Sequence, residues 1–112
     1  MKSPSLDNLL TAIKRDDCKS LQQLLDAGFD PNTEYAKGRT ALILAAEHQK
    51  PQIVRLLLQF GANVAHRDHD GYDAILTANY FGEYRMGAYT KESQEIGTML
   101  KEHMAGDADR PE

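Results

Sequence analysis

Residues 38–61, GRTALILAAEHQKPQIVRLLLQFG, predict two short helices that lie back to back. Thr40 is placed to cap the first helix, whose residues are mostly small or apolar. Pro51 suits the first position of the second helix because its missing N–H would have no partner there. Gly61 favours the left-handed conformation that follows a helix. The apolar residues Ile53, Val54, Leu56, Leu57 and Leu58 are too many for a helix with a single buried face, so the second helix is expected to be covered on two sides.

The same pattern recurs 33 residues away in both directions. Its upstream and downstream equivalents are Leu9, Ala12, Leu24, Leu25, Gly28, Gly71, Ala74, Ile75 and Ala78. Helix–turn–helix units at this period indicate a solenoid, because each unit buries its apolar face against the next one. About three repeats are needed to close a continuous core, and a chain of 112 residues has room for three in one domain.

The central unit resembles an ankyrin repeat. Thr40-Ala41-Leu42 stands where that family has Thr-Pro-Leu, and Leu44-Ala45-Ala46 stands where it has Leu-Ala-Ala. Residues 53–63 follow the family's second helix and its exit turn almost residue for residue. The resemblance covers residues 6–104 and implies an all-α solenoid of stacked helix–turn–helix units joined by short hairpin-like loops. It also implies that the activity is binding of a protein partner, without catalysis and without a cofactor.

The resemblance divides the chain into three repeats and two tails. The expected units are a flexible N-terminus (1–5), repeat 1 as the N-terminal cap (6–36), repeat 2 (37–69), repeat 3 as the C-terminal cap (70–104) and a disordered acidic tail (105–112). In repeat 3, the equivalents of Leu57 and Leu58 are Met99 and Leu100, at an offset of 42 residues rather than 33. This offset predicts an insertion of about 9 residues near 83–92, after a first helix that ends at Gly82.

Local signals mark further helix ends and loops. Asp17 is expected to cap the second helix of repeat 1, and Asp73 replaces threonine as the cap of repeat 3. The loops that follow Gly28 and Gly61, called fingers here, are equally long and should match in shape. Asp70-Gly71 supplies the turn chemistry of a tight hairpin in the second finger.

Composition excludes several classes of partner and location. A net charge of −4 and a pI of about 5.5 argue against nucleic acid and against an anionic membrane as partners. Cys18 has no second cysteine to pair with, which fits a reducing compartment. No apolar run is long enough to span a membrane and no signal-peptide pattern opens the chain, so a cytoplasmic protein is expected.

Candidate binding residues follow from the positions that usually face the binding side in ankyrin-like proteins, extended by Tyr84 and Arg85 from the insertion. They are Tyr35, Lys37, Arg39, Glu47, His48, His69, Asp70, Tyr72, Tyr80, Phe81, Tyr84 and Arg85. Tyrosine and arginine are enriched at protein interfaces and among their hot spots. An alternative is that the aromatic residues between 72 and 89 fold over the open end of the solenoid in place of a fourth repeat.

The function hypothesis is a small protein-binding module, expected to be a monomer, that inhibits, sequesters or connects its partner. Such a module includes an immunity or antitoxin-like protein and an adaptor. One alternative is self-association through the aromatic third repeat. A second is a metal-dependent enzyme centred on His66 and His69, because imidazoles and carboxylates are good metal ligands. Cys18 is either an inert small residue or, with Lys19 beside it, a thiol of lowered pKa.

Overall fold

The computed structural model describes residues 6–85 and 90–108, with side chains for residues 7–81 and 90–104. Over these residues the chain forms α-helices and one short 3₁₀ turn, and it has no strand. The elements are α1 (Leu6–Lys14), α2 (Cys18–Asp26), η1 (Ala36–Gly38), α3 (Ala41–Glu47), α4 (Pro51–Gln59), α5 (Ala74–Arg85) and α6 (Lys91–Ala108). The expected all-α solenoid of helix pairs is therefore confirmed.

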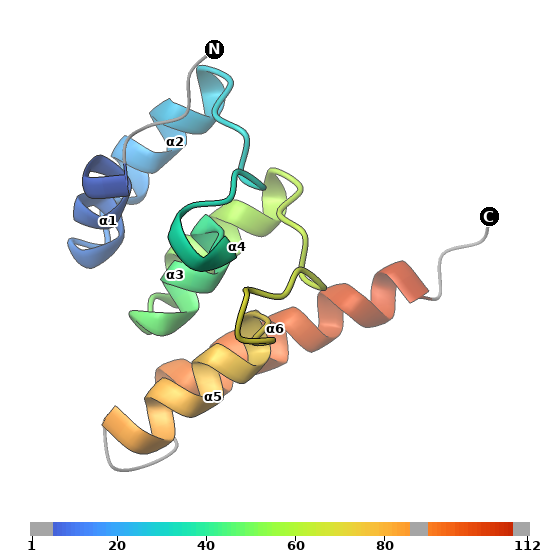
Figure 1. The fold of residues 1–112 in the computed structure, drawn as a ribbon. Helices are drawn as coiled ribbons and strands as arrows, with labels where there is room; N and C mark the ends of the chain where they lie inside the picture. Colours follow the sequence, from blue (N-terminus) through green and yellow to red (C-terminus); the bar gives the residue numbers. More distant parts are fainter. Residues whose placement is uncertain (1–5, 86–89, 109–112) are drawn as a thin grey trace.

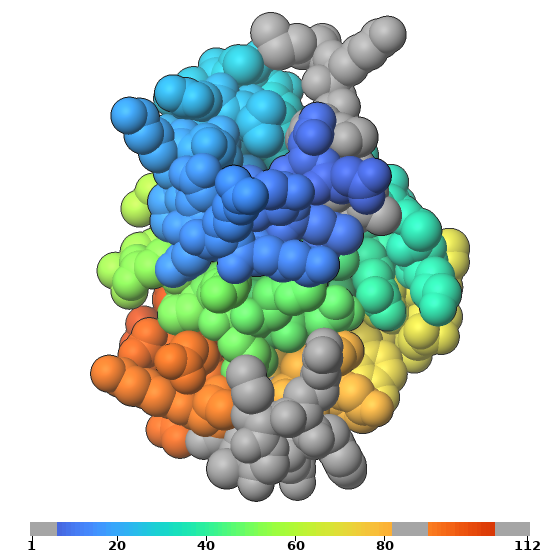
Figure 2. Space-filling view, turned by 90° about the vertical axis from the view of Figure 1, so that its left-hand side faces the viewer, coloured from blue at the N-terminus to red at the C-terminus, as the bar shows by residue number. Residues whose placement is uncertain are grey.

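The helices form two layers (Figure 1). The pairs α1–α2, α3–α4 and α5–α6 stack on one another, with α3 between α1 and α5 in one layer and α4 between α2 and α6 in the other. Figure 2 shows the three pairs as successive tiers, with the two fingers along one side of the stack. Each inner surface of a pair is thus covered by the next pair, as the solenoid argument requires.

The core is continuous through all three tiers. Every residue from Ala41 to Ala46 in α3 is buried, and so are Ile53, Val54, Leu56 and Leu57 of α4. The core extends to Leu9 in α1 and to Leu100 in α6. The middle pair has neighbours on both sides, which explains why its helices carry so many apolar residues.

Most of the expected helix ends are confirmed. The Asp17 carboxylate accepts a hydrogen bond from Ser20 N at 3.1 Å, and the Asp73 carboxylate accepts one from Leu76 N at 2.9 Å. Pro51 is the first residue of α4. Gly61 has φ +88°, the left-handed conformation expected after a helix.

The prediction for Thr40 is wrong in one respect. Thr40 occupies the N-cap position of α3, but its side chain makes no capping hydrogen bond. The residue is only 2% exposed, and its hydroxyl has no hydrogen-bond partner among the residues that the structure describes. At the start of α3, Thr40 is therefore packed in the protein interior without capping the helix, and its buried hydroxyl group is unsatisfied.

The two fingers match in shape, as their equal length predicts. Tyr35 N donates to Arg39 O at 2.8 Å, and the equivalent bond 33 residues later joins Asp68 N to Tyr72 O at 2.9 Å. Hydrogen bonds also connect one finger to the next. These are Asn32 Nδ2 to Gly61 O, Asn63 N to Asn32 Oδ1, His66 Nε2 to Gly38 O, and His69 N to Lys37 O, at 2.7–3.2 Å. The fingers therefore stack as the helices do.

We predict that Gly38→Ala lowers the free energy of unfolding by about 2 kcal/mol, measured by urea denaturation. Gly38 has φ +73°, which costs other residues about 1–2 kcal/mol. An added Cβ would also lie 2.6 Å from His69 Cδ2, so the His69 ring of the second finger would have to move away from Gly38. Gly71→Ala is the matched control, because Gly71 has φ +84° and nothing within 4 Å of an added Cβ. Equal losses in the two variants would contradict the stacking of the fingers.

A second prediction concerns pH. Hydrogen bonds from Ser20, first from its backbone N–H and then from its hydroxyl, lower the pKa of Asp17 below the ordinary value. A lowered folded-state pKa contributes stability above the unfolded pKa of about 3.9, and that stability is lost as the pH falls through the folded-state value. Denaturation at several pH values should therefore show Asp17→Ala less stable than the natural protein at pH 7. The gap should narrow below about pH 4; a gap that does not change with pH would contradict the capping role.

The third repeat departs from the other two. The helix α5 has 12 residues where α3 has 7, and it continues through Gly82 to Arg85. The expectation that Gly82 ends this helix is therefore wrong, and the extra length of α5 takes up part of the predicted insertion. Residues 86–89 lie outside the described part of the chain. The helix α6 has 18 residues and reaches Ala108, inside the segment 105–112 for which the sequence predicts disorder.

A buried polar network joins repeat 2 to repeat 3. Gln49, which is 8% exposed, donates from Nε2 to Ala46 O at 3.1 Å and to Ala78 O at 3.0 Å. Its Oε1 accepts hydrogen bonds from the hydroxyls of Thr90 and Ser93. Thr90 Oγ1 also accepts from Ser93 N at 3.0 Å, at the start of α6. One glutamine side chain thus satisfies groups on α3, α5 and α6.

Candidate functional site

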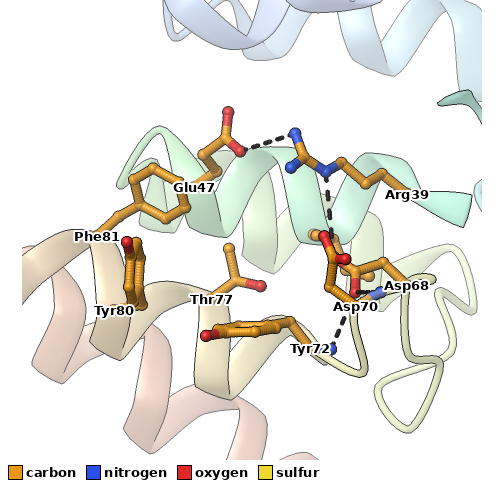
Figure 3. Close-up of a pocket in the computed structure, with 9 residues that line it drawn as sticks. Arg39, Glu47, Asp68, Asp70, Tyr72, Thr77, Tyr80 and Phe81 are labelled. Carbon is orange, nitrogen blue, oxygen red and sulfur yellow. Dashed lines mark hydrogen bonds and ion pairs between the residues drawn. The ribbon is translucent and has the colours of Figure 1, made fainter. Parts of the chain in front are cut away.

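A groove runs between α3 and α5 and is closed at one end by the second finger (Figure 3). Its volume is about 480 Å³. The residues that line this α3–α5 groove are Arg39, Ile43, Glu47, Asp68, Asp70, Tyr72, Thr77, Tyr80 and Phe81. Six of them are candidate binding residues from the sequence, so the structure brings half of that set together at one place.

The second finger holds the end of the groove in shape. Asp68 Oδ1 accepts hydrogen bonds from Asp70 N and from Tyr72 N, each at 2.9 Å. Gly71 N donates to Asp68 O at 3.0 Å, and Gly71 has φ +84°, which closes the turn that the Asp70-Gly71 pair predicts. The backbone of Tyr72 is therefore held in place by a buried carboxylate.

Aromatic rings form one wall of the groove. The ring centroids of Tyr72 and Tyr80 are 5.9 Å apart, and those of Tyr80 and Phe81 are 5.2 Å apart, both with edge-to-face geometry. Such contacts stabilise each pair by about 0.5–1.5 kcal/mol. Tyr72 is nevertheless 38% exposed and Tyr80 is 43% exposed. The rings are ordered by one another and still present a large surface to solvent.

Charged side chains form the opposite wall. Arg39 Nη1 donates to Glu47 Oε1 at 3.1 Å, and Arg39 Nε lies 4.0 Å from Asp68 Oδ2. The second carboxylate oxygen of Glu47 lies 3.5 Å from His48 Nε2. Arg39 therefore connects the finger to α3, and the guanidinium is fixed at the rim of the groove.

A second groove lies on the other side of α3. Its lining residues are Leu10, Lys14, Tyr35, Ala36, Lys37, Arg39, Leu44, Glu47 and His48, and its volume is about 310 Å³. This α1–α3 groove contains three more candidate residues and shares Arg39 and Glu47 with the first groove. Burial raises the pKa of the Tyr35 hydroxyl above its ordinary value, so Tyr35 stays neutral at neutral pH.

Three candidate residues lie apart from the grooves or outside the described side chains. His69 lies at the tip of the second finger, where its ring faces Gly38. Tyr84 and Arg85 are in the last turn of α5, and the structure does not describe their side chains. Whether these two residues extend the α3–α5 groove stays a prediction.

Sequence reasoning missed three residues of the α3–α5 groove, namely Ile43, Asp68 and Thr77. A signal existed for each of them. Asp68 is the 33-residue equivalent of Tyr35, and Ile43 and Thr77 lie one helical turn before Glu47 and Phe81. Extending the predicted face by one turn of each helix would have found both helical residues.

The His66–His69 finger does not form a metal site in the described structure. His66 Nε2 lies 2.8 Å from Gly38 O, and because a carbonyl only accepts, this nitrogen carries a proton. Among the described residues, no three His, Cys, Asp or Glu side chains come close enough together to hold a metal ion. The two rings serve contacts between the fingers instead.

The lowered thiol pKa considered for Cys18 is wrong. Burial raises the pKa of the Cys18 thiol, and the nearby carboxylates of Asp16 and Asp17 raise it further. These effects outweigh that of Lys19, because the thiolate would lie in a partly apolar setting beside two negative charges. Cys18 is therefore a poor nucleophile at neutral pH.

Comparison with known proteins gives one family. The family model for ankyrin repeats in three copies matches residues 9–89. The Notch-regulated ankyrin repeat-containing protein of Xenopus tropicalis is 30% identical over 82 residues, which are 70% of this chain and 72% of that protein.

Two longer proteins match over shorter segments. A putative ankyrin repeat-containing protein of Treponema pallidum is 40% identical over 60 residues, 54% of this chain and 20% of that protein. The glycerophosphocholine phosphodiesterase gde1 of Schizosaccharomyces pombe is 42% identical over 48 residues, 43% of this chain and 4% of that enzyme. The chain thus spans a small part of these two relatives. None of its described helices has the length and hydrophobicity needed to cross a membrane.

Proposed function

This chain belongs to the ankyrin repeat family, and from that premise we propose that it binds a protein partner through the α3–α5 groove without catalysing a reaction. Ankyrin repeats are protein–protein interaction modules. The observation that carries the proposal is the presence of Tyr72 and Tyr80, each about two-fifths exposed, beside the Arg39–Glu47 ion pair in one groove. Tyrosine and arginine at the centre of a concave surface are typical hot-spot residues.

The rigidity of the groove supports this proposal. Its side chains come from α3 and α5, which pack directly against each other, and from a finger closed by backbone hydrogen bonds. Side chains that are already ordered lose little conformational entropy when a partner binds. A groove of modest size can therefore give useful affinity.

The proposed consequence of binding is that the partner's own surface becomes covered. Inhibition or sequestration, as by an immunity or antitoxin-like protein, needs only such coverage, and an adaptor needs in addition a second binding surface. The α1–α3 groove offers one, since it lies directly beside the first groove. We propose a cytoplasmic location on the basis of the single cysteine, which fits a reducing compartment.

Affinity capture tests the proposal. Immobilised natural protein and the Tyr72→Ala/Tyr80→Ala double variant would be exposed to the same lysate of the source organism, after circular dichroism has shown that both are folded. The matched control is Phe60→Ala/Met104→Ala, which removes two equally exposed apolar side chains that line neither groove. We expect a protein retained by the natural form and by the control but not by the groove variant. Equal retention by all three, or none by any, would overturn the proposal.

Self-association is a second candidate, and one observation favours it. Leu76 is 44% exposed and lies one helical turn before Tyr80 on α5, so that Tyr72, Leu76 and Tyr80 form an exposed apolar stripe on the last repeat. Light scattering across a concentration series tests this alternative. A mass that rises with concentration in the natural protein and not in Leu76→Glu would support self-association, whereas a constant monomer mass would exclude it.

A further inference from the structure

We propose that the partner segment places an arginine side chain in the α3–α5 groove and a carboxylate in the neighbouring α1–α3 groove. The inference deepens the proposed function and rests on it, because it states the chemistry of the partner at that same surface. Three observations support the inference: the two grooves have opposite charges, the α3–α5 groove has an aromatic wall, and the two grooves lie on either side of α3.

The α3–α5 groove carries excess negative charge. Three carboxylates, those of Glu47, Asp68 and Asp70, line it against the single guanidinium of Arg39, which leaves two negative charges uncompensated. The side chain of Asp68 is only 5% exposed and that of Glu47 is 15% exposed. Charges shielded from water in this way are weakly screened by salt, so the groove attracts a cation more strongly than surface carboxylates would.

Asp70 is the acceptor that remains available in the groove. Arg39 and His48 already engage the two oxygens of Glu47, and the Asp68 carboxylate accepts the backbone N–H groups of the turn. No side chain among the described residues donates to the Asp70 carboxylate, which lies at the exposed rim. An incoming cation would therefore meet Asp70 first.

The aromatic wall selects arginine among cations. A guanidinium is planar and weakly hydrated, so that it stacks on an aromatic ring while its edge donates to a carboxylate. The groove offers both features together, since Tyr72 and Tyr80 line it alongside Asp70. A lysine ammonium is compact and strongly hydrated and gains less from such a site.

The α1–α3 groove has the opposite charge. Lys14, Lys37 and Arg39 line it against the single carboxylate of Glu47. Both lysine side chains are exposed, which leaves their ammonium groups accessible to a carboxylate from the partner. Because the two grooves share Arg39 and Glu47, a partner segment that crosses α3 passes directly from the basic groove into the acidic one.

The separation of the grooves sets the spacing of the two partner residues. Each groove lies between neighbouring helices of one layer, and packed helices are about 8–10 Å apart. An extended chain advances about 3.3 Å per residue. The arginine is therefore expected about three positions along the chain from the acidic residue, with two residues between them. Whether the acidic residue comes before or after the arginine in the partner's sequence then determines the direction in which the partner segment crosses α3.

Nuclear magnetic resonance titration of the full-length ¹⁵N-labelled chain tests the inference. The probes are the peptides acetyl-Gly-Asp-Ala-Ala-Arg-Gly-amide and acetyl-Gly-Arg-Ala-Ala-Asp-Gly-amide, together with versions in which citrulline replaces arginine. Citrulline keeps the shape of arginine and removes the charge. Millimolar peptide makes weak binding measurable.

We expect one of the two orders to shift amide signals of both grooves and to bind about tenfold more tightly than its citrulline version, since a hydrogen bond between charged groups is worth that factor. Asp70→Asn should weaken the arginine peptide about threefold. Glu102→Gln is the control, because Glu102 lies on α6 and lines neither groove. Equal affinity for arginine and citrulline peptides, or no shifts in the groove with either order, would overturn the inference. A partner captured through Tyr72 and Tyr80 would even then leave the proposed function standing.

Discussion

Replacing Gln49 with alanine is expected to lower the free energy of unfolding by about 3 kcal/mol, because it removes four hydrogen bonds, each of which contributes about 0.5–1.5 kcal/mol. Gln49 is almost fully buried and uses both hydrogens of its amide and both lone pairs of its oxygen. The substitution removes one donor to Ala78 O and one acceptor of the Thr90 hydroxyl at once, which leaves Ser93 Oγ as the remaining partner of both groups. Chemical denaturation of the two proteins gives the difference directly.

Two further variants separate the network from the backbone. Gln49 has φ +59°, so Gln49→Gly should be less destabilising than Gln49→Ala by about 1 kcal/mol, because glycine adopts this conformation without strain. A double-mutant cycle with Ser93→Ala should give a coupling energy of about 1 kcal/mol or more between residues that share a hydrogen bond. Additive losses in that cycle would contradict a network that joins repeats 2 and 3.

Replacing Tyr80 with alanine should reduce the affinity for the captured partner about 30-fold or more, the loss typical of an aromatic hot-spot residue. Tyr80 lies between Tyr72 and Phe81 in the aromatic wall, so its removal eliminates two ring contacts as well as its own exposed surface. Calorimetric titration with the purified partner measures the change.

The controls for Tyr80 separate binding from stability. Tyr80 is 43% exposed, so the alanine variant should remain folded and lose little stability. Tyr80→Phe keeps the ring and should bind within a few-fold of the natural protein if the aromatic surface provides the contact. An alanine variant with unchanged affinity would exclude Tyr80 from the interface.

The fold is predictable from the sequence wherever the 33-residue period holds. Ala41 and its equivalent Ala74, 33 residues later, are the first residues of α3 and α5. Pro51 begins α4 and Gly61 follows its end, as their local chemistry predicts. The period fails after Phe81, and the prediction fails at the same point, because Gly82 is tolerated inside a helix at a cost of only about 1 kcal/mol. The helix α5 packs against both α3 and α6.

The Gln49 network was not predictable for a different reason. The sequence shows Gln49 only as a polar residue in a turn, which is ordinarily exposed. Its burial depends on Thr90 and Ser93, more than 40 positions away and beyond the break in the period. No local sequence pattern predicts the hydrogen bonds of Gln49 with Thr90 and Ser93, because they depend on how α6 packs against the second repeat.

The α3–α5 groove is only partly predictable from the sequence. Family positions identify Arg39, Glu47, Tyr72 and Tyr80, since the fingers and first helices keep their register in repeats 2 and 3. Spacing alone does not reveal that Asp68 is buried or that the charges of the two grooves are opposite. These features depend on how side chains from α1, α3, α5 and the fingers come together.

The most direct test of the central claim is site-specific photocrosslinking. The photoreactive residue p-benzoylphenylalanine would be incorporated at position 80 in the α3–α5 groove, or at position 98 on the exposed side of α6, and each protein would be irradiated with the partner. We predict a covalent adduct from position 80 and none from position 98. An adduct from position 98 with none from position 80 would contradict binding through the groove.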